Sequence, residues 1–264
     1  METLQHKVVW ITGASSGIGE ALSYAFAAKG SRLVLSARRR DELERVKRNC
    51  AGAEQIELLD MDLSAADELP EKVRWVIEKM GGIDILVNNA GISQRSPAIA
   101  TSIAVYRKIM EVNFFGTVAL SNGVLAHFTQ RNQGLFVVIG SLAGKIGLPL
   151  RTAYCASKHA LEGFYSSLKT ETWKTNIRFL MVRPGPVKTN IAQNALLGDG
   201  KTFNQKDAFI EQGITPEKVA ESVLSAIEKN KRNLVPGSVK ERLVLLINKF
   251  LPKLVFNSAK KIRP

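Results

Sequence analysis

The chain has 264 residues, 45% of them hydrophobic, and a mean hydropathy of −0.02. This is enough apolar material to bury a sizeable core in one large α/β domain. A formal charge of +13 and a pI near 9.8 favour an anionic partner, either a phosphorylated cofactor or an acidic lipid surface. No nucleic-acid-binding module is recognisable, so we expect no nucleic-acid partner.

Targeting and metal-binding signals are not evident. The apolar run 8–11 is too short for the core of a signal peptide, and the longest apolar stretches fall short of the roughly 20 residues that cross a bilayer. Cys50 and Cys155 lack metal-ligand neighbours, and the three histidines are scattered. We therefore expect a soluble, cytoplasmic protein without a metal site.

Short apolar or β-branched runs alternate with longer helical patterns along the chain. The predicted strands are 8–11, 33–36, 56–59, 85–87, 135–139 and 177–182, and the predicted helices are 17–29, 41–50, 66–79, 102–130 and 154–174. Such alternation predicts a doubly wound parallel sheet with helices on both faces, a Rossmann-type α/β fold. No linker or repeat interrupts it, so residues 1–264 are expected to form a single domain.

A glycine-rich turn follows the first predicted strand and leads into a helix. It carries Gly13, Ser15, Ser16, Gly17, Ile18 and Gly19. Its glycines allow a sharp turn and close approach to a pyrophosphate, whose charge the free N–H groups of the helix N-terminus stabilise. The spacing is Gly-x-x-x-Gly-x-Gly rather than Gly-x-Gly-x-x-Gly. An ordinary glycine-rich turn is the alternative.

Basic residues follow the second predicted strand, where many NAD-binding sheets carry an acidic residue that bonds the adenosine ribose. Here Ala37 is followed by Arg38 and Arg39, whose guanidinium groups can bind a 2′-phosphate. The hydroxyl of Ser15 can add a hydrogen bond. The pattern favours NADP over NAD, whereas Arg40 is expected to be a solvated residue at the start of the next helix.

Three further segments end predicted strands at the edge where ligands bind. Asp62 and Leu63 follow the third strand, and the Asp62 carboxylate can accept from the adenine amino group; the alternative is a turn aspartate. Small residues after the fourth strand, Asn89, Ala90 and Gly91, allow backbone to approach the cofactor. A rigid turn after the sixth strand suits the nicotinamide carboxamide, and it contains Pro184, Gly185, Val187 and Thr189.

Tyr154 and Lys158 form the most informative pair in the chain. They are four residues apart, on one face of a helix, and Ser141 ends an apolar strand upstream. An ammonium about 4 Å from a phenol favours the phenolate by roughly 4 kcal/mol at an effective dielectric of about 20. We expect Lys158 to bring the pKa of Tyr154 towards 7, where acid–base catalysis works best. The alternative is a half-buried tyrosine beside a solvated lysine.

Taken together, these residues resemble the short-chain dehydrogenase/reductase family from about residue 6 to residue 189. The resemblance implies hydride transfer between NAD(P) and a carbonyl/alcohol pair. It gives catalytic roles to Asn113, Ser141, Tyr154 and Lys158: Tyr154 protonates the carbonyl oxygen, Ser141 holds that oxygen, Lys158 bonds the nicotinamide ribose, and Asn113 supports a water relay. Asn113 has an alternative as a helix-kink residue without chemistry. Tyr154 and Lys158 thus also contact cofactor, and Ser141 and Tyr154 contact substrate.

The resemblance also suggests a branch with membrane-anchored retinoid- and steroid-reducing members, and it implies a homodimer or homotetramer. A variable substrate flap is expected at about 190–214. Its apolar residues, Ala195, Leu196, Leu197 and Phe203, favour a partly apolar substrate. The segment 240–264 mixes apolar and basic residues, among them Lys260, Lys261 and Arg263, and is predicted to be an amphipathic tail that binds a membrane surface, another subunit or the domain itself.

The function predicted is therefore an NADP-dependent carbonyl reductase or alcohol dehydrogenase for a hydrophobic small-to-medium substrate. One alternative is a reductase of 3-oxoacyl thioesters. Another is a cofactor-binding interaction module without turnover.

Overall fold

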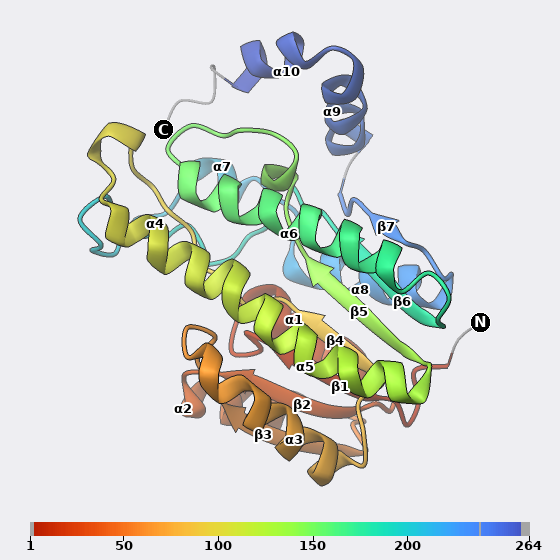
Figure 1. Ribbon diagram of the computed structural model, residues 1–264. Helices are drawn as coiled ribbons and strands as arrows, with labels where there is room; N and C mark the ends of the chain where they lie inside the picture. The colour runs from red at the N-terminus through yellow and green to blue at the C-terminus, as the bar shows by residue number, and fades with distance from the viewer. Residues whose placement is uncertain (1–2, 238, 260–264) are drawn as a thin grey trace.

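The computed structural model describes residues 3–237 and 239–259. Within them, seven parallel strands form one sheet in the order β3-β2-β1-β4-β5-β6-β7 (Figure 1). The strands are β1 (Val8–Thr12), β2 (Arg32–Ala37), β3 (Gln55–Asp60), β4 (Ile85–Asn88), β5 (Gly134–Ile139), β6 (Ile177–Val182) and β7 (Asn233–Leu234). The six predicted strands and the doubly wound fold are confirmed, and the two-residue β7 was missed.

Helices cover both faces of the sheet, as the alternation of side chains along β1 requires. On one face, Val9 and Ile11 pack under α1 (Gly17–Ala27), α2 (Arg40–Asn49) and α8 (Pro216–Glu228). On the other, Val8 and Trp10 pack under α3 (Leu69–Met80), α5 (Gly116–Arg131) and α6 (Thr152–Glu171). Strands buried on both faces read as continuous apolar runs, and all five residues of β1 are buried.

The chain order reverses beside β1, which pairs with β2 on one side and β4 on the other. In an open α/β sheet, loops that leave the strands on either side of such a switch point diverge and leave a crevice beyond the carboxyl ends. The glycine-rich turn follows β1, and the segment 89–91 follows β4. The topology therefore brings these two sequence motifs to the same crevice.

The long helix predicted at 102–130 consists of three parts. α4 (Ile103–Met110) leads into a π-helical turn at Glu111–Phe115, and α5 completes it. By length and apolar composition the whole segment Ile103–Arg131 could span a membrane, contrary to the expectation that no stretch is long enough. Within this segment, α5 buries Leu120, Val124 and Phe128 against the sheet. A helix in the core of a globular domain is buried in the same way.

α8 covers one face of the sheet, whereas the two helices that follow it lie beyond the sheet (Figure 1). α8 begins at Pro216, and the Thr215 hydroxyl caps it by accepting from the Lys218 N–H. α9 (Val239–Phe250) and α10 (Pro252–Ala259) form a separate pair, drawn in blue in Figure 1. They are separated at Leu251, and Pro252 opens α10, because proline fits the first turn of a helix but not its interior. Lys260, Lys261 and Arg263 lie outside the described residues.

Candidate active site

The glycine-rich turn after β1 is tightly packed. Gly13 and Gly17 have φ of +63° and +59°, which side-chain-bearing residues rarely adopt. A Cβ added to Gly19 would lie 2.3 Å from the Gly13 carbonyl oxygen and 2.5 Å from Asn89 Nδ2. The same Asn89 amide donates to the carbonyls of Thr12 (2.9 Å) and Gly13 (3.2 Å), so β4 holds the shape of the turn.

Thr12 ties the end of β1 to the segment after β4. Its hydroxyl donates to the Val87 carbonyl at 3.2 Å and accepts from the N–H groups of Asn89 and Ala90, each at 3.0 Å. The side chain is completely buried. Thr12 is therefore the reason that the two loops at the switch point keep a defined separation.

One cavity of about 1120 Å³ lies over the carboxyl ends of the strands. Its lining brings together nearly all residues that the sequence analysis proposed: Gly13, Ser15, Ser16, Gly17, Ile18, Arg38, Arg39, Asp62, Leu63, Asn89, Ala90, Gly91, Ser141, Tyr154, Lys158, Pro184, Gly185, Val187 and Thr189. Gly19 and Asn113 are not part of the lining. Gly19 instead allows the close contact of α1 with the turn.

Among the three consecutive arginines at the start of α2, only Arg40 forms ion pairs within 4 Å in the part of the chain that the structure describes. It pairs with Glu44 and Asp60, each at 3.4 Å. Arg38 and Arg39 are exposed and line the cavity. Their guanidinium groups are thus available to an anion, whereas Arg40 is the partly solvated residue that the sequence analysis expected.

Asp62 is both a turn aspartate and part of the cavity wall. Its Oδ1 accepts from the Ser64 N–H at 2.9 Å and from the Ser64 hydroxyl at 2.8 Å. Burial raises the pKa of Asp62, but these hydrogen bonds and the charge of Arg38 outweigh it, so the pKa lies below its usual value. The carboxylate is held ionised, and its Oδ1 is oriented by Ser64.

Ser141 and Tyr154 form the polar pair on the other side of the cavity. Ser141 follows β5, where its Oγ accepts from the Ala143 N–H at 3.1 Å, and its side chain acts on the Tyr154 hydroxyl. Burial raises the pKa of Tyr154, and the interaction with Ser141 and the charge of Arg151 oppose that rise. The net pKa is higher than that of free tyrosine, so the expected shift towards 7 is wrong for this structure. The phenol is protonated at neutral pH.

Lys158 lies one turn along α6 from Tyr154. The side chain is only 4% exposed, and its Nζ donates to the Ile139 carbonyl at 2.9 Å and lies 5.8 Å from the centre of the Tyr154 ring. Burial lowers the pKa of Lys158 to about 8. The alternative of a solvated surface lysine is therefore wrong, because the ammonium group is buried in the cavity wall.

Asn113 lies in the π-helical turn and is completely buried. Its Oδ1 accepts from the Ile92 N–H at 2.8 Å, and its Nδ2 donates to the Ile92 carbonyl (2.9 Å) and to Ser157 Oγ (3.0 Å). The side chain therefore clamps the loop after β4 to α6. Single π turns recur at functional sites, but the contacts seen here are those of a positioning residue.

The structure also shows residues that the sequence analysis missed. Asp207 in the flap pairs with Arg95 and, at 2.8 Å, with Arg151, the residue before α6. Gln94 is completely buried, and its Oε1 accepts from the Ala153 N–H at 2.7 Å at the start of α6. These contacts join residues 56 to 112 positions apart, so no local pattern signals them.

The helices α9 and α10 form part of the cavity wall. Val244, Ile247 and Val255 from α9 and α10 line it, together with Leu196, Phe209 and Ile210 from the flap region. The i, i+3 spacing of Val244 and Ile247 was the available signal for an inward-facing stripe.

The residues present fit a nicotinamide dinucleotide. A Cβ on Gly13 would meet the Ala90 Cα at 2.8 Å, so the glycine turn and the β4 loop approach each other as closely as backbone allows. Phosphate groups can bind the N–H groups at the start of α1. Several cations line the cavity, among them Arg38, Arg39 and Lys158. This combination of sheet and site defines a Rossmann-type oxidoreductase.

Comparisons with known proteins identify the family within that class. Residues 7–199 match the short chain dehydrogenase family. A "Dehydrogenase/reductase SDR family protein 7-like" of Anopheles gambiae is 40% identical over 264 residues, which cover 98% of this chain and 83% of the relative. The chain therefore belongs to the short-chain dehydrogenase/reductase family, whose members are oxidoreductases that use a nicotinamide cofactor and often form oligomers.

Further matches agree with this assignment. "Dehydrogenase/reductase SDR family member 7" of Homo sapiens is 48% identical over 202 residues, 74% of this chain and 60% of the human protein. An alcohol dehydrogenase of Thermococcus sibiricus, solved with 5-hydroxy-NADP, superposes with a TM-score of 0.76, 28% identity and coverage of 89% and 97%. A Burkholderia phymatum enzyme solved with NAD has a TM-score of 0.84 at 21% identity, with coverage of 100% and 99%, which supports the fold.

Proposed function

We propose that this chain is an NADP-dependent oxidoreductase that interconverts a carbonyl and a primary or secondary alcohol on a hydrophobic, small-to-medium substrate. The observation that carries the proposal is that Ser141, Tyr154 and the buried Lys158 line the same cavity as the glycine-rich turn. When bound, the nicotinamide supplies or accepts the hydride.

The side chains provide the accompanying proton and hold the reacting oxygen. In the reductive direction, the protonated Tyr154 hydroxyl donates its proton to the carbonyl oxygen as negative charge develops there. Ser141 donates a hydrogen bond to the same oxygen and stabilises that charge. Lys158 holds the nicotinamide ribose, and its positive charge stabilises the phenolate left on Tyr154. Arg151, the other nearby cation, lowers the pKa of Tyr154 in the same sense.

The same cavity accommodates the rest of the cofactor in this proposal. Asp62 accepts from the adenine amino group, and Thr189 bonds the nicotinamide carboxamide at the turn after β6. Arg38 and Arg39 bind the 2′-phosphate of the adenosine ribose, which no carboxylate at the end of β2 repels. Solved relatives contain either NAD or NADP, so the preference for NADP depends on these two arginines.

Replacing both arginines tests the cofactor preference. In Arg38→Ala/Arg39→Ala, the dissociation constant of NADPH is expected to rise about 10²-fold, because each charge-assisted hydrogen bond contributes about 1.5–3 kcal/mol. The dissociation constant of NADH should change less than about threefold, since NADH has no 2′-phosphate. Calorimetric titration with both nucleotides measures this. Arg40→Ala is the matched control and should leave both values unchanged. Equal losses for NADPH and NADH would contradict the assignment.

Apolar side chains in the cavity lining favour a hydrophobic substrate. Leu142, Ile146 and Leu148 follow Ser141, and Leu196 and Phe209 face the same cavity. A panel of free ketones, aldehydes and 3-oxoacyl thioesters, followed by NADPH absorbance, distinguishes the proposed function from a thioester reductase. Tight NADPH binding without turnover of any panel member would indicate a cofactor-binding module instead.

We further propose a homodimer or homotetramer in the cytoplasm, with α9 and α10 resting on an anionic membrane surface. Val239, Leu243, Leu246 and Phe250 are 49% to 76% exposed, although Val244 and Ile247 of the same helix face the cavity. Lys249 Nζ lies 5.4 Å from the centre of the Phe250 ring, and the exposed Lys253 is in the first turn of α10. With a net charge of +13, apposing two copies through this face costs electrostatic energy, whereas an anionic bilayer is complementary to it.

Sedimentation with liposomes tests the membrane contact. The intact chain is expected to sediment with vesicles that contain about 30% anionic lipid, and not with neutral vesicles. Binding of this kind requires both the burial of apolar area and the attraction of lysines to anionic lipid. Leu246→Ser/Phe250→Ser should lower the bound fraction at least about fivefold. Trp173→Ser, which removes a similarly exposed aromatic just after α6, is the control. Unchanged binding of the double variant would refute the contact, and a change in oligomeric state instead would assign this face to self-association.

A further inference from the structure

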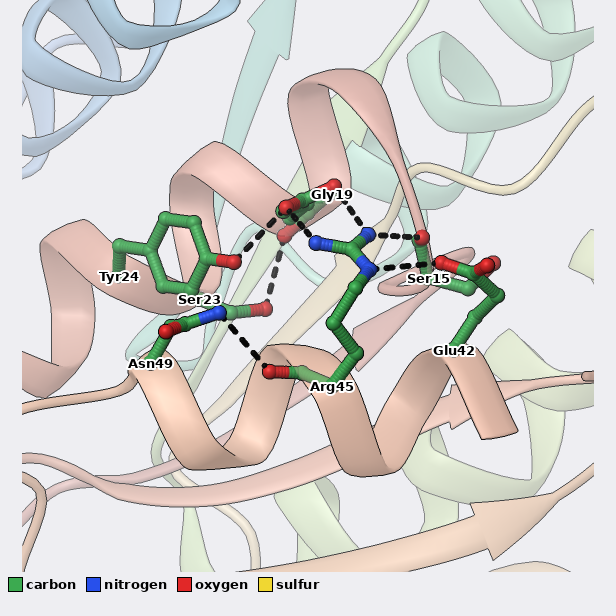
Figure 2. A network of polar contacts seen from close by, with 8 residues as sticks. Ser15, Gly19, Ser23, Tyr24, Glu42, Arg45 and Asn49 are labelled. Carbon is green, nitrogen blue, oxygen red and sulfur yellow. Dashed lines mark hydrogen bonds and ion pairs between the residues drawn. The ribbon is translucent and has the colours of Figure 1, made fainter. Parts of the chain in front are cut away.

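Arg45 of α2 joins the second helix to the cofactor turn. Its Nη1 and Nη2 bind the two oxygens of Glu20 at 2.6 and 2.9 Å, and its Nη2 also donates to the Ser15 carbonyl at 3.3 Å (Figure 2). Its Nε binds Glu42 at 2.8 Å. The Tyr24 hydroxyl donates to the same Glu20 at 2.7 Å. A single guanidinium therefore contacts α1, the glycine-rich turn and α2.

Glu20 has an unusual place for a carboxylate. It lies in the first turn of α1, directly after Gly17, Ile18 and Gly19, where the free N–H groups receive the cofactor pyrophosphate. An acidic side chain here favours an isolated helix, but it repels the phosphates that the turn must bind. The hydrogen bond from Arg45 lowers the pKa of Glu20, so the carboxylate stays ionised at all physiological pH values. Its charge therefore has to be neutralised by a partner.

We infer that Arg45 is a positioning residue for dinucleotide binding, which neutralises Glu20 and holds the Ser15 carbonyl so that the phosphate-binding turn is pre-shaped. The inference rests on the proposed dinucleotide-binding function. Arg45 is not in the cavity lining, and its guanidinium is engaged by two carboxylates. It acts on the cofactor through Glu20 and Ser15 rather than by contact.

This role differs from that of Arg38 and Arg39 in a measurable way. The pyrophosphate is common to NADPH and NADH, whereas the 2′-phosphate belongs to NADPH alone. Loss of Arg45 should therefore weaken both dinucleotides by the same factor, and loss of Arg38 and Arg39 should weaken only NADPH. A comparison of the two nucleotides thus separates positioning of the turn from recognition of the 2′-phosphate.

The test measures dissociation constants of NADPH and NADH by titration of the intact chain, with melting temperatures recorded for every variant. Arg45→Met is expected to raise both constants about tenfold, because the charge of Glu20 is then no longer neutralised and repels the pyrophosphate. The KM for NADPH should rise by a similar factor, with kcat changed less than about twofold. Arg40→Met is the matched control, because Arg40 is also ion-paired on α2 but contacts neither Glu20 nor the turn.

Removal of the carboxylate identifies the cause. Glu20→Gln in the Arg45→Met background should restore both constants to within about threefold of the original chain, because the repulsion is gone. Arg45→Lys should lie between, since it retains the charge but cannot bind Glu20 and Ser15 with one fork. If Arg45→Met does not fold, Glu20→Gln alone still tests the inference and should bind both dinucleotides at least as tightly as the original chain.

Several results would overturn the inference. These are unchanged binding in Arg45→Met, a loss confined to NADPH, no recovery on adding Glu20→Gln, or weaker binding by Glu20→Gln alone. If the original chain binds neither dinucleotide, it is the proposed function that fails. If it binds either one normally while Arg45→Met also does, only the role of Arg45 fails.

Discussion

Tyr154→Phe is expected to lower kcat for carbonyl reduction by at least about 10³-fold, within the range that general acid catalysis contributes. The substitution removes one oxygen and leaves the ring that packs in the cavity wall. Tyr154 is protonated at neutral pH and interacts with Ser141, so the substitution removes the proposed proton donor. Steady-state turnover of NADPH with the best substrate of the panel measures the effect.

Binding and stability provide the controls for this variant. The dissociation constant of NADPH should remain within about threefold, because the phenol oxygen touches the reacting centre and not the phosphates. Tyr24→Phe is a matched control, since it also removes a hydroxyl that is hydrogen bonded, here to Glu20, far from Ser141. Turnover by Tyr154→Phe within tenfold of the original chain would remove the basis of the proposed mechanism.

The parts of this site that could be predicted from the sequence are those that sit at the ends of strands. Apolar runs of the right length located six strands, and in a parallel sheet their carboxyl ends share one edge. Once the strands are placed, residues as distant as Gly13, Asp62 and Thr189 must lie around the same cavity. This required only the order of the elements and no knowledge of side-chain contacts.

What could not be predicted depends on long-range packing. The clamp formed by Asn113 on Ile92 requires a π-helical turn, and nothing in the run Glu111–Phe115 distinguishes that turn from an ordinary helix beforehand. The pKa of Tyr154 depends on how deeply the phenol is buried, and a spacing of four residues reports only its distance from Lys158. The ion pairs of Arg45 likewise join α1 and α2, whose relative placement the sequence does not encode locally.

The strand β7 and the division of α9 into two apolar sides could not be predicted from the sequence for the same reason. β7 has two residues, too few for a periodic signal, and it exists because Asn233 and Leu234 align with Met181 and Val182 of β6. α9 was expected as an amphipathic tail, but both of its sides carry apolar residues. One side closes the cavity and the other is exposed, a division that only the folded chain reveals.

Lys158→Met should have opposite effects on activity and on stability. The ammonium is desolvated in the folded chain, and a pKa of about 8 instead of 10.5 corresponds to about 3 kcal/mol of unfavourable free energy when it is charged. Methionine of similar length removes that cost but leaves the Ile139 carbonyl without its donor, which costs about 1–2 kcal/mol. The free energy of unfolding at pH 7 should therefore rise by about 1–2 kcal/mol, as measured by urea denaturation. Turnover should fall at least about 10²-fold, because the charge that holds the ribose and supports the phenolate is gone.

The pH dependence separates this explanation from better packing. Below pH 8 both the folded and the unfolded chain carry the charged lysine, so the full penalty applies. Between pH 8 and 10.5 the folded chain releases the proton while the unfolded chain retains it, so the original chain gains stability relative to Lys158→Met as the pH rises. The advantage of the variant should therefore shrink through this window. If the stability advantage of Lys158→Met is constant from pH 7 to pH 10, the advantage arises from packing. The charge of Lys158 then does not destabilise the folded chain, and the chain does not trade stability for activity at this position.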